Sequence, residues 1–168
     1  MNKDVVGASA GAITVLGTGG ALTTIGPWYA ALKKPSWQPP GWLFGPAWTL
    51  IGVLTTIAAV RSWRHAKAPG ERNRVLALFA CNGVFNVLWS LLFFNRRRPD
   101  LALGEIVPLW GSIAALILGL PRKPGTSVAS SSITWLLLPY LGWVSFAAVL
   151  NYEVVRLNAP FEKGSGSD

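Results

Sequence analysis

Five long apolar blocks constrain the fold of this 168-residue chain more than any other feature. A bilayer core of about 30 Å needs about 20 helical residues to cross it. Each block approaches that length, and the connections between blocks are polar and basic. The chain is therefore predicted to form one all-α membrane domain over residues 1–160, a five-transmembrane-helix bundle followed by a disordered tail at 161–168. The predicted spans are about 5–25, 42–63, 75–94, 101–120 and 133–157.

Composition agrees with a membrane domain, because 51% of the residues are apolar and only 13% are charged. Soluble domains carry about 25% charged residues. The net charge of +8 comes from Lys and Arg in the loops, where basic residues typically flank membrane spans. No basic helix with interleaved aromatic residues is found, so we expect the lipid bilayer as a partner and no nucleic acid.

The loop between the first two blocks, Trp28 to Trp42, is unusually rich in tryptophan and proline. It holds Trp28, Trp37 and Trp42, a pair of lysines and three prolines. So much indole surface is more than a connector needs. We predict that this first loop is a lid over a flat, apolar ligand.

The first block contains Gly7 and Gly11 in a small-x-x-x-small spacing. This spacing lets two helix backbones approach closely. Two alternatives stay open, namely packing within one chain and the seam of a homodimer.

Asn82, Asn86, Trp89 and Phe93 are spaced by four, three and four residues, which places them on one helical face. An unpaired amide in hydrocarbon costs several kcal/mol, so this face is expected to point into the bundle. It either makes hydrogen bonds between helices or forms a cavity wall with polar handles for a ligand.

Tryptophans within the spans extend the predicted site. Trp48 begins a face with Gly52, Thr55 and Ala59 in the second span, and the fifth span has Trp135, Pro139, Trp143 and Phe146 on one face. Tryptophan normally gathers at the membrane interfaces. Trp48 and Trp143 lie several residues inside their blocks, so we interpret them as walls of a binding site.

The sequence contains no set of side chains typical of hydrolysis, phosphate binding or metal binding. The single histidine, His65, lies at the basic end of a span, and no motif supports a haem ligand. We therefore expect no required cofactor and no metal site.

Motifs in order along the chain resemble the TspO/MBR family of tryptophan-rich sensory proteins, which includes the mitochondrial translocator protein. The resemblance covers about residues 28–158. It rests on Trp28-Tyr29, the run from Lys34 to Pro40, Pro46 to Thr49, Phe85 to Ser90 with Phe93-Phe94, Pro139 to Trp143, Leu150-Asn151, and Arg156 to Asn158.

The resemblance implies a five-helix bundle, often dimeric, whose first long loop closes over a pocket for protoporphyrin IX or a related tetrapyrrole. It implies ligand contacts for Tyr29, Trp48, Asn82, Asn86 and Trp143. A sterol motif would fall on Leu150, Tyr152 and Arg156. Two departures from the family pattern change the pocket wall, since Asn82 stands where a glutamine is frequent and Gly52 where a tyrosine is frequent.

We therefore predict a multi-pass sensory or regulatory protein that binds a tetrapyrrole, in a bacterial envelope membrane in preference to the mitochondrial outer membrane. Two alternatives are a light- and oxygen-dependent porphyrin-degrading enzyme, in which Trp48 and Trp143 would be the catalytic redox partners, and a porphyrin or sterol transporter. The predicted ligand-binding residues are Tyr29, Trp37, Pro39, Trp48, Asn82, Asn86, Trp89, Trp135, Trp143 and Phe146.

Overall fold

The computed structural model describes residues 26–161. The predicted span at 5–25 and all but the first residue of the predicted tail lie outside this range. The described elements are α2 (Pro27–Ala31), the 3-10 turn η1 (Gly41–Leu43), α3 (Phe44–His65), α4 (Pro69–Ser90), the π-helical turn η2 (Leu91–Asn95), α5 (Pro99–Gly119) and α6 (Ser132–Asn158).

Four helical segments are long and apolar enough to cross a membrane. They are Gly41–His65, Pro69–Asn95, Pro99–Gly119 and Ser132–Asn158, and the described residues contain no strand. These segments confirm four of the predicted spans and the all-helical class. The chain is a multi-pass membrane protein.

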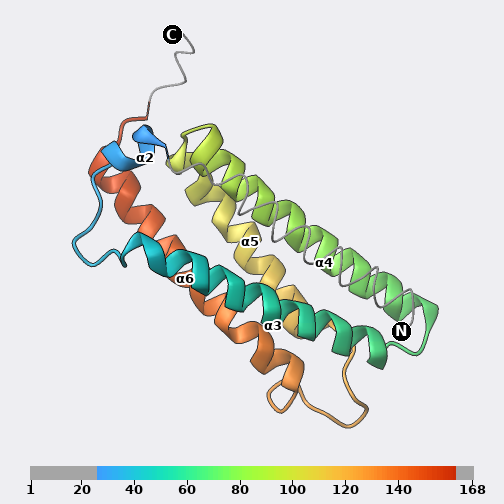
Figure 1. The fold of residues 1–168 in the computed structure, drawn as a ribbon. Coiled ribbons are helices and arrows are strands. Elements are labelled where there is room, and N and C mark those ends of the chain that lie inside the picture. The colour runs from blue at the N-terminus through green and yellow to red at the C-terminus, as the bar shows by residue number, and fades with distance from the viewer. Residues whose placement is uncertain (1–25, 162–168) are drawn as a thin grey trace.

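The long helices pack in an order that differs from their order along the chain (Figure 1). α5 packs against both α4 and α6, and α3 packs mainly against α6, whereas α3 and α4 contact each other much less. Ile113 and Leu116 of α5 and Leu137 and Tyr140 of α6 are fully buried between the helices. The arrangement brings α3 and α6 together over most of their length, and the predicted site lies along that contact.

The start of α4 corrects the sequence prediction, which began this span at about residue 75. The helix begins at Pro69. Proline is well suited to a first helical position, since its missing N–H would have no partner there. The Glu71 carboxylate accepts hydrogen bonds from the backbone N–H groups of Lys67 at 2.7 Å and Ala68 at 3.1 Å, which stabilises the first turn.

At the opposite end, α4 widens into η2 before the chain turns into α5. Buried Asn151 of α6 holds the first turn of α5 at this end. With its amide oriented to satisfy both groups, it donates to the Pro99 carbonyl at 3.0 Å and accepts from the Leu103 N–H at 3.1 Å. The two helices are thereby fixed to each other beside the loop that precedes α3.

Candidate functional site

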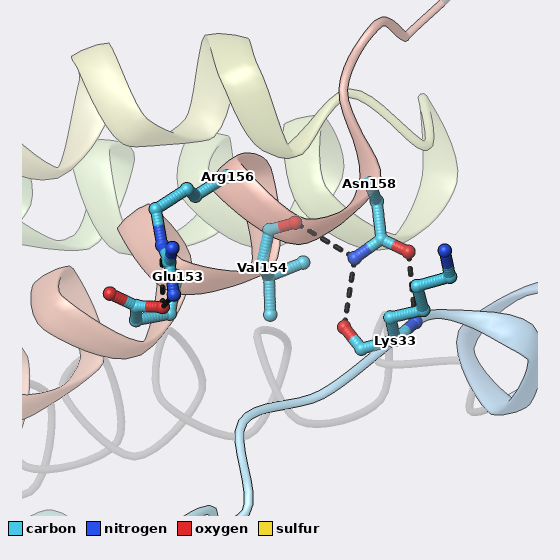
Figure 2. Close-up of polar contacts among 5 residues, drawn as sticks. All are labelled: Lys33, Glu153, Val154, Arg156 and Asn158. Atoms are coloured by element: carbon cyan, nitrogen blue, oxygen red, sulfur yellow. Dashed lines mark hydrogen bonds and ion pairs between the residues drawn. The ribbon is translucent and has the colours of Figure 1, made fainter.

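The first loop is attached to the end of α6 by hydrogen bonds to one side chain (Figure 2). The Lys33 N–H donates to Asn158 Oδ1 at 2.8 Å, and Asn158 Nδ2 donates to the Lys33 carbonyl at 2.8 Å. The same amide nitrogen lies 2.8 Å from the Val154 carbonyl. Asn158 therefore ties the loop backbone to the last turn of α6.

A second attachment is aromatic, and we call it the anchor cluster: Trp28, Tyr29, Trp89, Phe93 and Phe94. The Tyr29 ring lies 5.6 Å from Phe94 and 6.3 Å from Phe93, and Trp28 meets Phe93 edge-on at 6.2 Å. Trp89 stacks on Phe93 at 5.1 Å. α2 is thus packed onto the end of α4 and onto η2.

The Tyr29 side chain also meets the loop itself. The Lys34 ammonium lies 4.3 Å from the centre of its ring, a cation–π contact that joins α2 to the residues after it. Burial raises the pKa of the Tyr29 phenol, so the neutral form is favoured.

Beyond these attachments the loop reaches a group of rings that we call the lid cluster: Trp37, Phe44, Trp48, Tyr140, Trp143 and Phe146. Trp37 meets Phe146 at 6.0 Å, and Trp143 meets Phe146 at 5.6 Å and Phe44 at 5.5 Å. Trp48 meets Tyr140 at 6.2 Å. These contacts form two groups: one joins the loop, the start of α3 and α6, and the Trp48–Tyr140 pair joins α3 to α6 one turn further along.

The two predicted amides lie behind the lid cluster and have protein partners. Asn82 Nδ2 donates to Ser112 Oγ at 2.8 Å, and Asn86 Nδ2 donates to the Tyr140 hydroxyl at 3.0 Å. That hydroxyl in turn donates to Asn82 Oδ1 at 3.4 Å. Of the two alternatives for these asparagines, the structure shows hydrogen bonds between helices, and both amides are connected to the lid cluster through Tyr140.

Other predicted site residues lie in different places. Trp89 belongs to the anchor cluster, and Pro39 is half-buried in the loop. Trp135 is 65% exposed and does not join the lid cluster. Of the predicted face of the fifth span, Trp143 and Phe146 lie in the lid cluster, whereas exposed Pro139 and Trp135 do not. The reason is position along the helix, because Trp135 lies eleven residues, or about 16 Å, before Phe146 and near the opposite end of α6.

The three sterol-motif positions do not form one surface. Leu150 is buried, whereas Tyr152 is 54% exposed. Arg156 forms an ion pair with Glu153, with guanidinium nitrogens 2.7 and 3.0 Å from one carboxylate oxygen (Figure 2). A sterol on the outer surface of α6 would meet Tyr152 and Arg156 but not Leu150.

Sequence reasoning missed three residues of this region. Phe44 lies four residues before Trp48 and Tyr140 three before Trp143, and helical spacing places each on the same side as its partner. That spacing was a usable signal for both. Ser112, which accepts from Asn82 and donates to the Leu109 carbonyl at 2.7 Å, follows no pattern in the sequence.

Within residues 26–161, no group of three His, Cys, Asp or Glu side chains is placed to hold a metal ion. Two pockets lie away from the lid cluster. One, of about 250 Å³, lies beside Trp28 and Phe94, and the other, of about 440 Å³, lies between the end of α3 and the start of α6. Neither is lined by Trp48, Trp143 or the two asparagines.

The family model that matches this chain is described as the TspO/MBR family and covers residues 6–157. A tryptophan-rich protein TspO from Archaeoglobus fulgidus is 37% identical over 90% of this chain and 95% of its own length. A tryptophan-rich sensory protein from Cereibacter sphaeroides is 36% identical over 84% of this chain and 83% of its own length. The human translocator protein is 33% identical over 82% of this chain and 78% of its own length.

Proposed function

This chain belongs to the TspO/MBR family, and from that premise we propose that it is a membrane sensory or regulatory protein that binds a tetrapyrrole of the protoporphyrin IX type. The lid cluster is the observation that carries the proposal. Its rings come from the loop, α3 and α6, and they meet at 5.5–6.2 Å in two groups, one of four rings and one formed by Trp48 and Tyr140. Aromatic faces bury large areas with defined geometry, which suits a planar apolar ligand.

Each part of the site then has a role. Trp48 and Trp143 form the walls, and Trp37 with Pro39 forms the cover, which separates from Phe146 when the macrocycle enters. Tyr29 and Asn158 hold the loop at its base. Asn82 and Asn86 position Tyr140, a role that replaces the direct ligand contact expected from the sequence.

The finer architecture belongs to the same proposal. Residues 5–25 would supply a fifth span, and Gly7 and Gly11 the seam of a homodimer. A bacterial envelope membrane is the proposed location. The four observed spans support a multi-pass protein.

Titration with protoporphyrin IX tests the proposal. The purified chain in neutral detergent is expected to shift the porphyrin absorption band at micromolar ligand. Trp48→Ala and Trp143→Ala should weaken binding at least tenfold, which is about 1.4 kcal/mol. Trp135→Ala is the matched control, because Trp135 is exposed and outside the lid cluster. An absent shift in wild type, or equal weakening in all three variants, would contradict the site.

A light- and oxygen-dependent porphyrin-degrading enzyme is the second candidate. The run of ring contacts from Trp37 through Phe146 and Trp143 to Phe44 favours it, because oxidisable indoles would lie against a photosensitising ligand. Illumination of the complex in air is the test. A new absorbing product that Trp143→Phe abolishes while porphyrin still binds would establish the enzyme, and identical bleaching in both proteins would exclude it.

A further inference from the structure

The end of the bundle opposite the lid holds a pocket of about 440 Å³ with a strongly basic lining. We propose that this pocket binds a phosphate group, carried by a lipid headgroup or by a soluble anion. Its volume is in the range of ligand sites. The inference is independent of tetrapyrrole binding. The lining residues are Arg61, Arg64, His65, Lys123, Thr126, Ser130, Ser131 and Ser132.

The basic side chains converge on the pocket from two elements. Arg61, Arg64 and His65 follow the i, i+3, i+4 spacing and so share one face of the last turns of α3. Lys123 comes from the loop between α5 and α6. Arginine guanidinium groups present paired N–H donors that match phosphate oxygens, which makes them well suited to this anion.

These charges have no acidic partner in the described part of the chain. The two salt bridges there, Arg98–Asp100 and Arg156–Glu153, involve other residues. No Asp or Glu lines the pocket. Glu71, near the start of α4, accepts from the backbone of Lys67 and Ala68 instead. Moreover, His65 Nδ1 is buried without a hydrogen-bond partner among the described residues.

Hydroxyl groups and a helix start complete the lining. Ser131 caps α6, its Oγ accepting from the Ile133 N–H at 3.2 Å, and Ser132 is the first residue of that helix. The start of a 27-residue helix carries partial positive charge and favours anions. The loop is held in shape, since Ser127 Oγ lies 2.6 Å from Ser130 Oγ and the Thr126 N–H donates to the Lys123 carbonyl at 3.1 Å.

Basic residues commonly flank membrane spans without forming a site. Two other cations at this end of the bundle, Arg122 and Arg72, have structural partners. Arg122 donates to the carbonyls of Ile117 and Leu118, which closes the end of α5, and Arg72 lies 5.3 Å from the ring of Trp63. Arg61, Arg64 and Lys123 differ from them because they line a pocket together with hydroxyl groups.

Thermal unfolding of the full chain in neutral maltoside micelles tests the proposal. One arm adds sodium phosphate against sodium chloride of equal ionic strength, and the other adds phosphatidylglycerol against phosphatidylcholine. Ligand at 100 times its Kd should raise the midpoint by roughly 5 °C. Arg61→Gln/Arg64→Gln should lose the rise, whereas Lys67→Gln/Arg74→Gln, with the same charge change outside the pocket, should keep it. Lys123→Gln, in an exposed loop, serves if the arginine variant fails to fold.

The two arms separate the sources of the phosphate group. A rise with sodium phosphate assigns a soluble anion, and a rise with phosphatidylglycerol alone assigns a lipid headgroup. Either result supports the pocket if the arginine or lysine pocket variants abolish it. No rise in either arm, or an equal rise in the pocket and control variants, would overturn the proposal.

Discussion

At the scale of single residues, Tyr140 connects the polar and aromatic parts of the site. Its side chain is fully buried, its hydroxyl lies 3.0 Å from Asn86 Nδ2 and 3.4 Å from Asn82 Oδ1, and its ring meets Trp48. Tyr140→Phe keeps the ring but leaves a buried amide without its partner, so we expect a loss of about 1–2 kcal/mol in the free energy of unfolding. Unfolding in mixed micelles measures it. Tyr152→Phe, on an exposed residue, should have almost no effect, and equal losses in the two variants would contradict this role.

Tyr29 predicts a pH dependence of the loop attachment. Burial raises the pKa of its phenol, so the folded protein favours the neutral form. The attachment is therefore at full strength below the ordinary pKa of about 10 and weakens as the pH rises above that value, because the unfolded phenol loses its proton first. Tryptophan fluorescence between pH 9 and 12 measures the loop contacts. The wild-type protein should lose contacts over this range that the Tyr29→Phe variant retains. Parallel curves for the two proteins would contradict a role for the Tyr29 phenol.

Residue spacing predicted which side chains face inward but not what they touch. The four-three-four spacing from Asn82 to Phe93 indicated an inward face, and Asn82, Asn86 and Phe93 are buried. Whether those amides meet a ligand or another helix depends on Ser112 and Tyr140, which are 30 and 54 residues away along the chain. A local pattern in one helix carries no information about such partners.

At the scale of elements, one asparagine supplies the hydrogen bonds that join the backbone of the loop to α6. Asn158→Ala removes two hydrogen bonds to the Lys33 backbone, each of 2.8 Å. Each bond contributes about 0.5–1.5 kcal/mol, so local opening of the loop should become at least fivefold more frequent. Limited trypsin digestion after Lys33 reports this opening. Asn73→Ala, on an exposed residue of α4, is the control, and unchanged cleavage in Asn158→Ala would show that the anchor cluster alone holds the loop.

The ends of the helices could be predicted where hydropathy changes sharply. They were harder to predict where capping interactions determine where the helix begins. The span predicted at 133–157 matches Ser132–Asn158 closely, and the one predicted at 101–120 matches Pro99–Gly119. α4 begins six residues before its predicted start, because its first turn is polar and is held by Pro69 and Glu71 instead of by lipid. Hydropathy measures membrane exposure, so it misses helical turns that extend into water.

At the scale of the whole molecule, α3 and α6 contribute to both proposed sites, which lie at opposite ends of the bundle. The lid cluster uses the start of α3 and the middle of α6, and the basic pocket uses the end of α3 and the start of α6. Trp48 and Arg64 are sixteen residues apart on one helix, which at 1.5 Å per residue is about 24 Å. No residue of the lid cluster lines the basic pocket.

The two sites are therefore expected to act independently. Arg61→Gln/Arg64→Gln should change the Kd for protoporphyrin IX by less than about twofold, since distant sites with no shared partners usually act independently. If binding at one site shifted α3 against α6, the two sites would be coupled. Each ligand would then change the affinity of the protein for the other by the same factor, as linkage requires. Porphyrin titrations with and without the phosphate-bearing ligand, on wild type and on this variant, distinguish the two cases. A reciprocal change of fivefold or more in wild type, lost in the variant, would mean that the α3–α6 contact transmits binding from one end of the bundle to the other.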